Sequence, residues 1–194
     1  LSTCIYPEHA NSYPMKEHQL YDGPPPIQNF SYAYAKRCMA VQIDSYCSQY
    51  KKENWCYVMP CNLYGEDDKF EFERSHYVSS LIDKIYNSKD GKVHLLGTGK
   101  PLRQFMYAGD LSLALKTMVE KKIFKNLNIA NDEVCSIKEI AEIALSTLQK
   151  ENFELVFSGN KVEDGNYRKD VSSDKLKLLF GDFNFTPLSK GIKK

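Results

Sequence analysis

Two residues of the segment "SYAYAKR" have the types and the spacing that proton transfer requires. Tyr32 and Lys36 are four positions apart, so on a helix they share one face. A phenol has an ordinary pKa of about 10, and a neighbouring ammonium favours its ionised form. The pair therefore predicts a tyrosine that exchanges protons near neutral pH. The alternative is a half-buried tyrosine beside a surface lysine, which is the commoner meaning of this spacing.

The opening residues, "LSTCIYP", supply a hydroxyl and a thiol. We expect this segment to be the end of a strand that stops before Pro7. In a strand, Ser2 and Cys4 project from one face and Thr3 from the other. A thiol has an ordinary pKa of about 8.5, so Cys4 can serve as a base; it can equally be a small buried apolar residue.

Two further residues could bind or move charge. His76 stands at the start of a helical segment, "HYVSSLIDKIYNS", and an imidazole with a pKa of about 6.5 can transfer protons or simply lie in solvent. Arg103, in "PLRQF", is a candidate for a bidentate phosphate contact. The sequence thus offers a base, an acid and an anion-binding group from separate segments.

Strands and helices alternate along the chain, which favours an α/β architecture with parallel pairing and right-handed crossovers. After a proline-rich loop at 21–30, a helix is predicted from Ser31 to about Lys52, with an apolar face made of Ala33, Ala35, Met39, Ala40 and Ile43. Further helices are predicted in "HYVSSLIDKIYNS", "DLSLALKTMVEKK", "SIKEIAEIALSTL" and near "SSDKLKLLF". Strands are predicted at 55–60, in two parts of "KVHLLGTGKPLRQFMY" around a glycine-rich turn, in "NLNIA" and in "FELVF".

Composition narrows the class of protein. The chain has 194 residues, of which 42% are hydrophobic and 26% charged, with a net charge of +1, so neither nucleic acid nor an anionic membrane surface is an expected partner. No apolar run approaches the roughly 20 residues of a membrane span. The six cysteines are irregularly spaced and lack a zinc-ligand pattern, so we expect reduced thiols, no metal and a cytoplasmic protein. Two glycosylation sequons, at Asn29 and Asn184, would matter only in a secreted chain.

The order of five segments resembles the extended short-chain dehydrogenases/reductases across residues 1–194: "LSTCIYP", "NFSYAYAKR", "MPCNLYG", "RSH" and "GTGKPLRQFMYAGDL". The resemblance is strongest to members that epimerise GDP-4-keto-6-deoxy-D-mannose at C3 and C5 and then reduce C4 with NADPH, giving GDP-L-fucose. It implies an NADP(H)-dependent epimerase-reductase that acts on a GDP-sugar as a homodimer.

The resemblance also implies residue roles. Ser2, Tyr32 and Lys36 would carry out the reduction, while Cys4 and His76 would be the epimerisation pair. Because the C4 carbonyl acidifies the protons at C3 and C5, one group must remove a proton and another must return one from the opposite face. Contacts to NADP(H) are expected from Ser2, Thr3, Tyr32, Lys36, Pro60, Cys61, Asn62, Leu63 and His76. Contacts to the GDP-sugar are expected from Lys84, Leu96, Arg103, Asp164 and Lys169, with Leu96 standing where the family usually has Trp.

No glycine-rich dinucleotide motif follows a strand in these residues. In the family this motif lies before the segment that corresponds to residue 1. We therefore expect a fragment that lacks the N-terminal cofactor-binding part and is inactive alone. Residues 1–63 would be the C-terminal part of a Rossmann domain and 64–194 mainly a smaller mixed α/β substrate domain, with about 106–131 returning to the Rossmann sheet.

Two alternatives stay open. Another nucleotide-sugar epimerase or dehydratase of the same family would share Tyr32 and Lys36 but not the pair of Cys4 and His76. A non-catalytic module that binds sugar nucleotides or mediates dimerisation would need neither pair. The sequence preceding Leu1 separates the last alternative, because a glycine-rich βα turn there would indicate a complete cofactor site.

Overall fold

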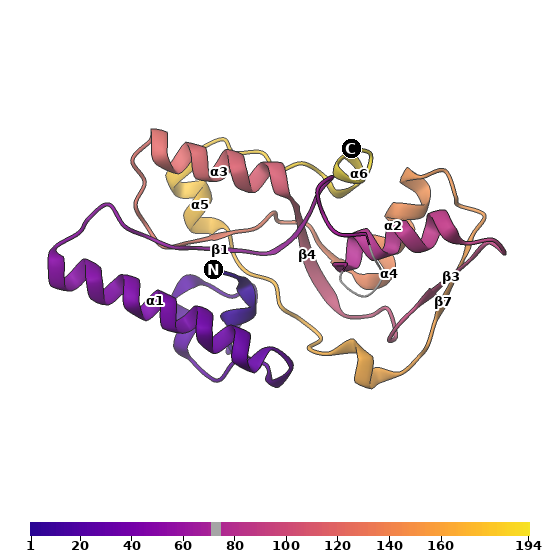
Figure 1. Ribbon diagram of the computed structural model, residues 1–194, viewed down its shortest axis with the longest axis horizontal. Coiled ribbons are helices and arrows are strands. Elements are labelled where there is room, and N and C mark those ends of the chain that lie inside the picture. Colours follow the sequence, from indigo (N-terminus) through magenta and orange to yellow (C-terminus); the bar gives the residue numbers. More distant parts are fainter. Residues whose placement is uncertain (71–74) are drawn as a thin grey trace.

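Helices and strands alternate along the chain, as the sequence predicts (Figure 1). The structure is a computed structural model that describes residues 1–70 and 75–194, so Arg74 of the "RSH" segment lies outside the described residues. The α-helices are α1 (Phe30–Tyr50), α2 (Tyr77–Asn87), α3 (Ala108–Glu120), α4 (Ile137–Thr147), α5 (Asp174–Phe180) and α6 (Leu188–Ile192). The strands are β1 (Val58–Pro60), β2 (Asn62–Tyr64), β3 (Lys92–Leu95), β4 (Leu102–Tyr107), β5 (Leu127–Ile129), β6 (Val134–Ser136) and β7 (Glu154–Phe157). Short 3-10 helices are η1 (Thr3–Ile5), η2 (Glu17–Tyr21), η3 (Ile27–Asn29) and η4 (Lys161–Asp164).

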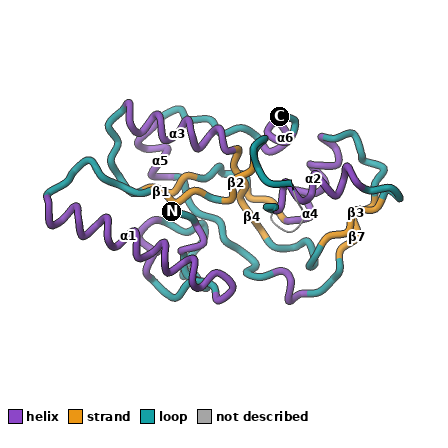
Figure 2. The backbone as a smooth tube through the Cα atoms, in the orientation of Figure 1, coloured by secondary structure: helices purple, strands orange, loops and turns teal. Residues whose placement is uncertain are grey.

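The strands pair mainly in parallel, which confirms the expected α/β class. β1 pairs with β5, β2 with β4, and β3 with β7, all in parallel. β6 was not predicted, and it lies antiparallel to β4. The two strands around the glycine-rich turn, β3 and β4, are both present, but each pairs with other strands (Figure 2).

Two hydrophobic clusters occupy the two halves of the molecule. The first gathers residues of β1, β5, α5 and the N-terminal segment, and the second gathers residues of α2, α4, β3 and α6. β4 runs between the halves (Figure 1). Its successive residues point to opposite faces, so Phe105 packs in the second cluster and Met106 in the first. This strand therefore carries Arg103 to the boundary between the halves.

The first residues do not form the expected strand. Ser2 and Tyr6 are extended, but residues 3–5 between them form η1, in which the Ser2 hydroxyl accepts a hydrogen bond from the Cys4 amide at 3.2 Å. Short hydroxyl side chains commonly favour such turns over strands. The chain still begins beside β1, since the Leu1 ammonium donates to the Val58 carbonyl at 2.7 Å.

The helix α1 has the predicted bounds to within two residues, but only part of the predicted face is buried. Ala33 and Ala40 are buried, whereas Ala35 is exposed and Met39 is 44% exposed. Arg37 takes part of that face, because its Nε donates to the Ile5 carbonyl at 2.7 Å and so ties α1 to η1. Neither α1 nor any other helix in the described ranges is both long and apolar enough to cross a membrane.

Candidate active site

A cavity of about 330 Å³ lies beside β4, in the half that holds the second hydrophobic cluster. Its walls come from the first turns of α2, the glycine-rich turn after β3, β4 and η4. Four of the five residues expected to bind the GDP-sugar line it, each from a different segment: Lys84, Leu96, Arg103 and Asp164. Segments up to 80 residues apart in the sequence thus converge on one space, with two cations in its wall.

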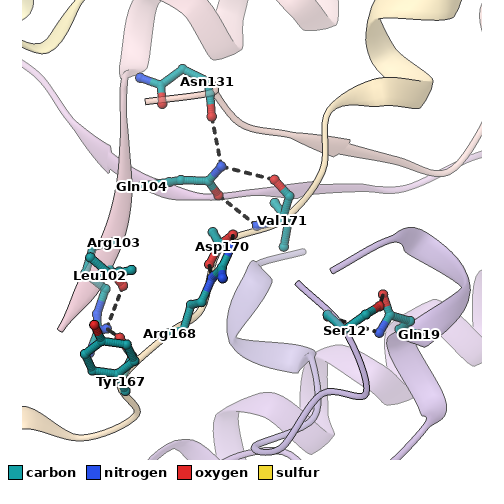
Figure 3. A network of polar contacts seen from close by, with 10 residues as sticks. All are labelled: Ser12, Gln19, Leu102, Arg103, Gln104, Asn131, Tyr167, Arg168, Asp170 and Val171. Carbon is teal, nitrogen blue, oxygen red and sulfur yellow. Dashed lines mark hydrogen bonds and ion pairs between the residues drawn. The ribbon is translucent and has the colours of Figure 1, made fainter. Parts of the chain in front are cut away.

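Arg103 is held in place by neutral carbonyl oxygens (Figure 3). Its guanidinium donates to the carbonyls of Leu102 at 2.8 Å and Asp164 at 3.1 Å. Burial lowers the pKa of Arg103, and the nearby Asp164 carboxylate partly offsets this. The group keeps its charge at any physiological pH. An oriented, partly desolvated cation of this kind is suited to bind an anionic ligand.

Asp164 fixes the glycine-rich turn. Its two carboxylate oxygens accept hydrogen bonds from the Thr98 amide at 2.7 Å and the Thr98 hydroxyl at 2.8 Å. These donors lower the pKa of Asp164 despite an opposing effect of burial. Gly97 has a φ of +74°, and a Cβ at this position would collide with the Asp164 carboxylate. The turn that carries Leu96 is therefore shaped by this aspartate.

Lys169 lies next to Arg103. A parallel bridge joins Leu102 to Arg168, and the Leu102 amide donates to the Tyr167 carbonyl at 2.7 Å. The same register places Lys169 opposite Arg103. Burial lowers the pKa of Lys169, and the charge of Arg103 lowers it further. The fifth expected substrate residue thus lies beside Arg103, although it does not line the cavity itself.

A buried hydrogen-bond network holds this segment against β4 (Figure 3). The Gln104 side chain donates to the Asn131 carbonyl at 2.9 Å and accepts from the Val171 amide at 2.9 Å. Asp170, which is 1% exposed, pairs with Arg168 through two hydrogen bonds of 2.6 and 2.9 Å. The polar side chains therefore fix the position of the neighbouring cations before any ligand is present.

Cys4 lies within electrostatic range of these cations. A negative charge on its thiol raises the pKa of both Arg103 and Lys169, against the larger lowering effect of burial. Cys4 is partly buried and is one of six free cysteines. The η1 turn, rather than the predicted strand, brings the thiol to this position.

Tyr32 and Lys36 lie together on α1. The Lys36 ammonium is 5.6 Å from the centre of the Tyr32 ring, a cation–π distance, and Tyr32 is 49% exposed. After burial, the charge of Lys36 is the second cause that lowers the pKa of the Leu1 ammonium, so this lysine lies near the start of the chain. Within the described residues, no hydrogen bond joins Tyr32 to Ser2.

The segment Pro60–Leu63 lies where the chain changes its strand partners. β1 pairs with β5 and ends at Pro60, and β2 pairs with β4 and begins at Asn62. Between them, the Cys61 amide donates to the Ile129 carbonyl at 3.0 Å. Burial raises the pKa of the Cys61 thiol to about 12, so this thiol is not a nucleophile at neutral pH. In α/β folds such switch points at strand ends are common ligand sites.

His76 caps the start of α2 and is oriented by an aspartate. Its Nδ1 lies 3.1 Å from Asp68, whose other oxygen accepts a hydrogen bond from Ser79. Burial raises the pKa of Asp68, but the hydrogen bonds from Ser79 and His76 outweigh it and hold the pKa below its usual range. The His76 side chain is 73% exposed. No hydrogen bond or ion pair connects His76 with Cys4 in the described ranges.

Two residues with roles in this site were not predicted. Asp68 orients His76, and Glu163 accepts a hydrogen bond from the Gly97 amide at 3.0 Å. Asp68 lies in the acidic run "EDD", and Glu163 is adjacent to Asp164. Nothing in a run of acids shows which member faces a partner far away in the sequence, so only the three-dimensional arrangement identifies them.

Comparison with known proteins agrees with this geometry. The sequence profile of the NAD dependent epimerase/dehydratase family matches residues 1–130. The chain is 35% identical over 201 residues to the GDP-L-fucose synthase of Dictyostelium discoideum and 36% identical over 197 residues to that of Sinorhizobium fredii. Each match covers all of this chain and 61% of the relative. The chain therefore spans about three fifths of the length of these curated relatives.

Solved structures show the same likeness. The GDP-L-fucose synthetase of Naegleria fowleri, in a structure with bound NADP, superposes with a TM-score of 0.87 at 30% identity, over 100% of this chain and 62% of that protein. A GDP-6-OMe-4-keto-L-xylo-heptose reductase from C. jejuni superposes with a TM-score of 0.85 at 26% identity. Since the profile covers the first 130 residues and the relatives cover the whole chain, the chain belongs to the NAD dependent epimerase/dehydratase family.

Proposed function

We propose that this chain forms the larger part of an enzyme that epimerises GDP-4-keto-6-deoxy-D-mannose at C3 and C5 and reduces it at C4 to GDP-L-fucose. The observation that carries the proposal is that the Cys4 thiol lies within electrostatic range of Arg103 and Lys169, and that Arg103 lines the cavity. An enzyme that epimerises a nucleotide sugar needs a proton-transfer group that reaches the sugar while a cation binds the diphosphate. The similarity to GDP-L-fucose synthases supports the choice of substrate.

The residues present fit the nicotinamide half of NADP(H). A phenol and an ammonium share one accessible face of α1, near the start of the chain, and Pro60–Leu63 lies at a strand switch point. Ser2, Thr3, Tyr32, Lys36, His76 and the segment 60–63 would hold that half of the cofactor. When bound, NADPH supplies the hydride that adds to C4 of the sugar.

In the reduction, Tyr32 would donate its phenolic proton to the C4 oxygen. The adjacent Lys36 ammonium stabilises the phenolate that remains, because an opposite charge favours the ionised form. Ser2 would hold the same carbonyl oxygen through its hydroxyl. Its hydroxyl already accepts a hydrogen bond from the Cys4 amide, which leaves its own proton available to the substrate.

In the epimerisation, Cys4 and His76 would exchange protons at C3 and C5 on opposite faces of the sugar. One group takes the proton that the C4 carbonyl acidifies, giving an enolate, and the other returns a proton to the same carbon. Asp68 lies 3.1 Å from Nδ1 of His76 and would accept its proton in a hydrogen bond, which would leave Nε2 as the exchanging nitrogen.

Several finer features belong to the same proposal. Residues 1–63 would be the end of a Rossmann domain that the first hydrophobic cluster continues, with residues 106–131 returning to it through β5. Residues 64–194 would be mainly the substrate domain. The complete enzyme would act as a cytoplasmic homodimer.

The test uses the protein expressed from its complete reading frame. With GDP-4-keto-6-deoxy-D-mannose and NADPH, we expect GDP-L-fucose, identified by chromatography and by NMR of the sugar. A reduced product with unchanged configuration at C3 and C5 would identify a plain reductase instead. Absence of both NADPH oxidation and product would favour the non-catalytic module.

A further inference from the structure

Ser75 lines the cavity, and its hydroxyl oxygen is buried. The Ser75 Oγ is shielded from solvent and makes no hydrogen bond with the part of the chain that the structure describes. A buried polar group without a partner destabilises a fold, and most such groups in native proteins are satisfied. The hydroxyl therefore lacks a structural reason to be there.

The surroundings of Ser75 indicate the charge of the missing partner. The same cavity is lined by Lys84 and Arg103 and by the carboxylates of Glu163 and Asp164. Both carboxylates accept hydrogen bonds from the glycine-rich turn. The start of a helix carries a partial positive charge and favours anions. Among the described residues, Arg103 donates its hydrogen bonds to carbonyl oxygens, and the nearby Asp164 carboxylate is engaged by Thr98, so the guanidinium charge is only partly compensated.

We propose that Ser75 is a binding residue for a nucleoside diphosphate-sugar, and that its hydroxyl donates a hydrogen bond to a diphosphate oxygen in this cavity. The proposal rests on the GDP-sugar function proposed above and adds a contact to the same site. None of the described residues satisfies the hydroxyl, and a bound diphosphate would do so. Ser75 would thus lower the stability of the protein without ligand and raise its affinity for the ligand.

This account makes affinity and stability change in different directions. Replacing Ser75 by alanine removes a hydrogen bond to a charged oxygen, which should weaken GDP binding by about tenfold or more. The same change removes an unsatisfied buried hydroxyl, so the melting temperature without ligand should stay equal or rise. A serine with a merely structural role would lower the melting temperature instead.

The experiment measures GDP binding by isothermal titration calorimetry and thermal melting for the full 194-residue chain and its variants. Ser75→Ala should lose affinity for GDP, and Ser75→Thr, which keeps the hydroxyl, should retain most of it. Guanosine, which lacks phosphates, should bind both forms equally. Ser112→Ala is the matched control, because its hydroxyl donates to the Ala108 carbonyl within the exposed surface of α3.

The outcomes distinguish a failure of the role of Ser75 from a failure of the proposed GDP-sugar function. If the parent chain binds GDP and Ser75→Ala binds it equally well, the role of Ser75 is wrong while the GDP-sugar site stands. If Ser75→Ala loses affinity only together with a lower melting temperature, the hydroxyl is structural and the inference fails. If the parent chain binds neither GDP nor pyrophosphate, the proposed function and the inference fail together.

Discussion

The cavity and the exposed face of α1 differ in what holds their charged side chains. In the cavity, Arg103 and Asp164 each make at least two hydrogen bonds to neighbouring segments, and their positions are set within this chain. On α1, Lys36 contacts the Tyr32 ring, and about half of Tyr32 is exposed. The comparison teaches that the side chains of the cavity are fixed by contacts within these 194 residues, whereas the Tyr32 and Lys36 pair lies on an accessible helix face. Under the proposed function, the first region would bind the diphosphate and the second would carry out the reduction.

The largest loss of activity is expected from a substitution on α1. Tyr32→Phe in the complete protein should reduce the rate of NADPH oxidation by roughly 10²- to 10⁴-fold, because it removes the proton donor to the C4 oxygen. GDP affinity should be unchanged, since Tyr32 takes no part in the cavity. Steady-state kinetics and calorimetry measure the two effects.

Tyr34→Phe provides the matched control, because Tyr34 lies on the same helix, is 41% exposed and packs near Phe30. It should leave reduction nearly unaltered. Equal losses in GDP affinity and reduction for Tyr32→Phe would show that the two regions are not separable in this way.

A smaller effect is expected from the cavity cation. Arg103→Met keeps the aliphatic stem but removes the charge, so GDP affinity should fall by about 10- to 100-fold. Arg103→Lys should fall in between, since an ammonium cannot make a bidentate contact. Lys116→Met, which removes a surface ion pair with Glu120 in the other half, should bind GDP as the parent does.

Calorimetry on the 194-residue chain separates these variants. If Arg103→Met binds GDP with the same affinity as the parent chain, the diphosphate does not bind in this cavity. Arg103 would then have no role in binding GDP, and the cavity would not differ from α1 in function.

The smallest effect should come from the aspartate that shapes the glycine-rich turn. Asp164→Asn weakens the contact with Thr98, and GDP affinity should fall by about threefold to tenfold because the turn is less well fixed. The folded protein lowers the pKa of Asp164, so this carboxylate stabilises the fold above the ordinary aspartate pKa of about 3.9 and loses that effect as the pH falls through its folded pKa.

Thermal melting between pH 3 and 7 tests whether the Asp164 carboxylate stabilises the fold when it is ionised. The parent chain should lose more melting temperature below about pH 4 than Asp164→Asn does. Asp174→Asn, at an aspartate whose side chain is 73% exposed, should follow the parent curve. Identical curves for the parent and Asp164→Asn would show that the turn does not depend on this carboxylate.

Much of the fold could be predicted because it depends on local patterns. The helix α4 begins at the predicted cap, where Ser136 and Glu139 form the expected capping box. The strand β6 has only three residues, which is too short for an alternating pattern of apolar and polar side chains. It is defined by its antiparallel pairing with β4. Ser2 was assigned to a strand by alternation, but its own hydroxyl stabilises a turn that alternation does not detect.

The site could be predicted only where a resemblance supplied the residues. Leu96, Arg103 and Asp164 were expected to contact one ligand, and they line one cavity. That Asp164 hydrogen-bonds Thr98 over an interval of 66 residues could not be inferred, because no local rule selects such a partner. Ser75 was equally hidden, since an unsatisfied hydroxyl is a property of packing.

The most direct test of the account concerns the thiol near the cavity cations. Cys4→Ser in the complete protein replaces a thiol, which can act as a base, with an alcohol that does not ionise usefully. Uptake of deuterium from heavy water at C3 and C5 of the 4-keto sugar, without NADPH, should fall by roughly 10²- to 10⁴-fold, while NADPH oxidation on a ketone that the variant accepts should survive. Exchange at the parent rate in Cys4→Ser would contradict the epimerase assignment and leave a reductase or another nucleotide-sugar enzyme of the family.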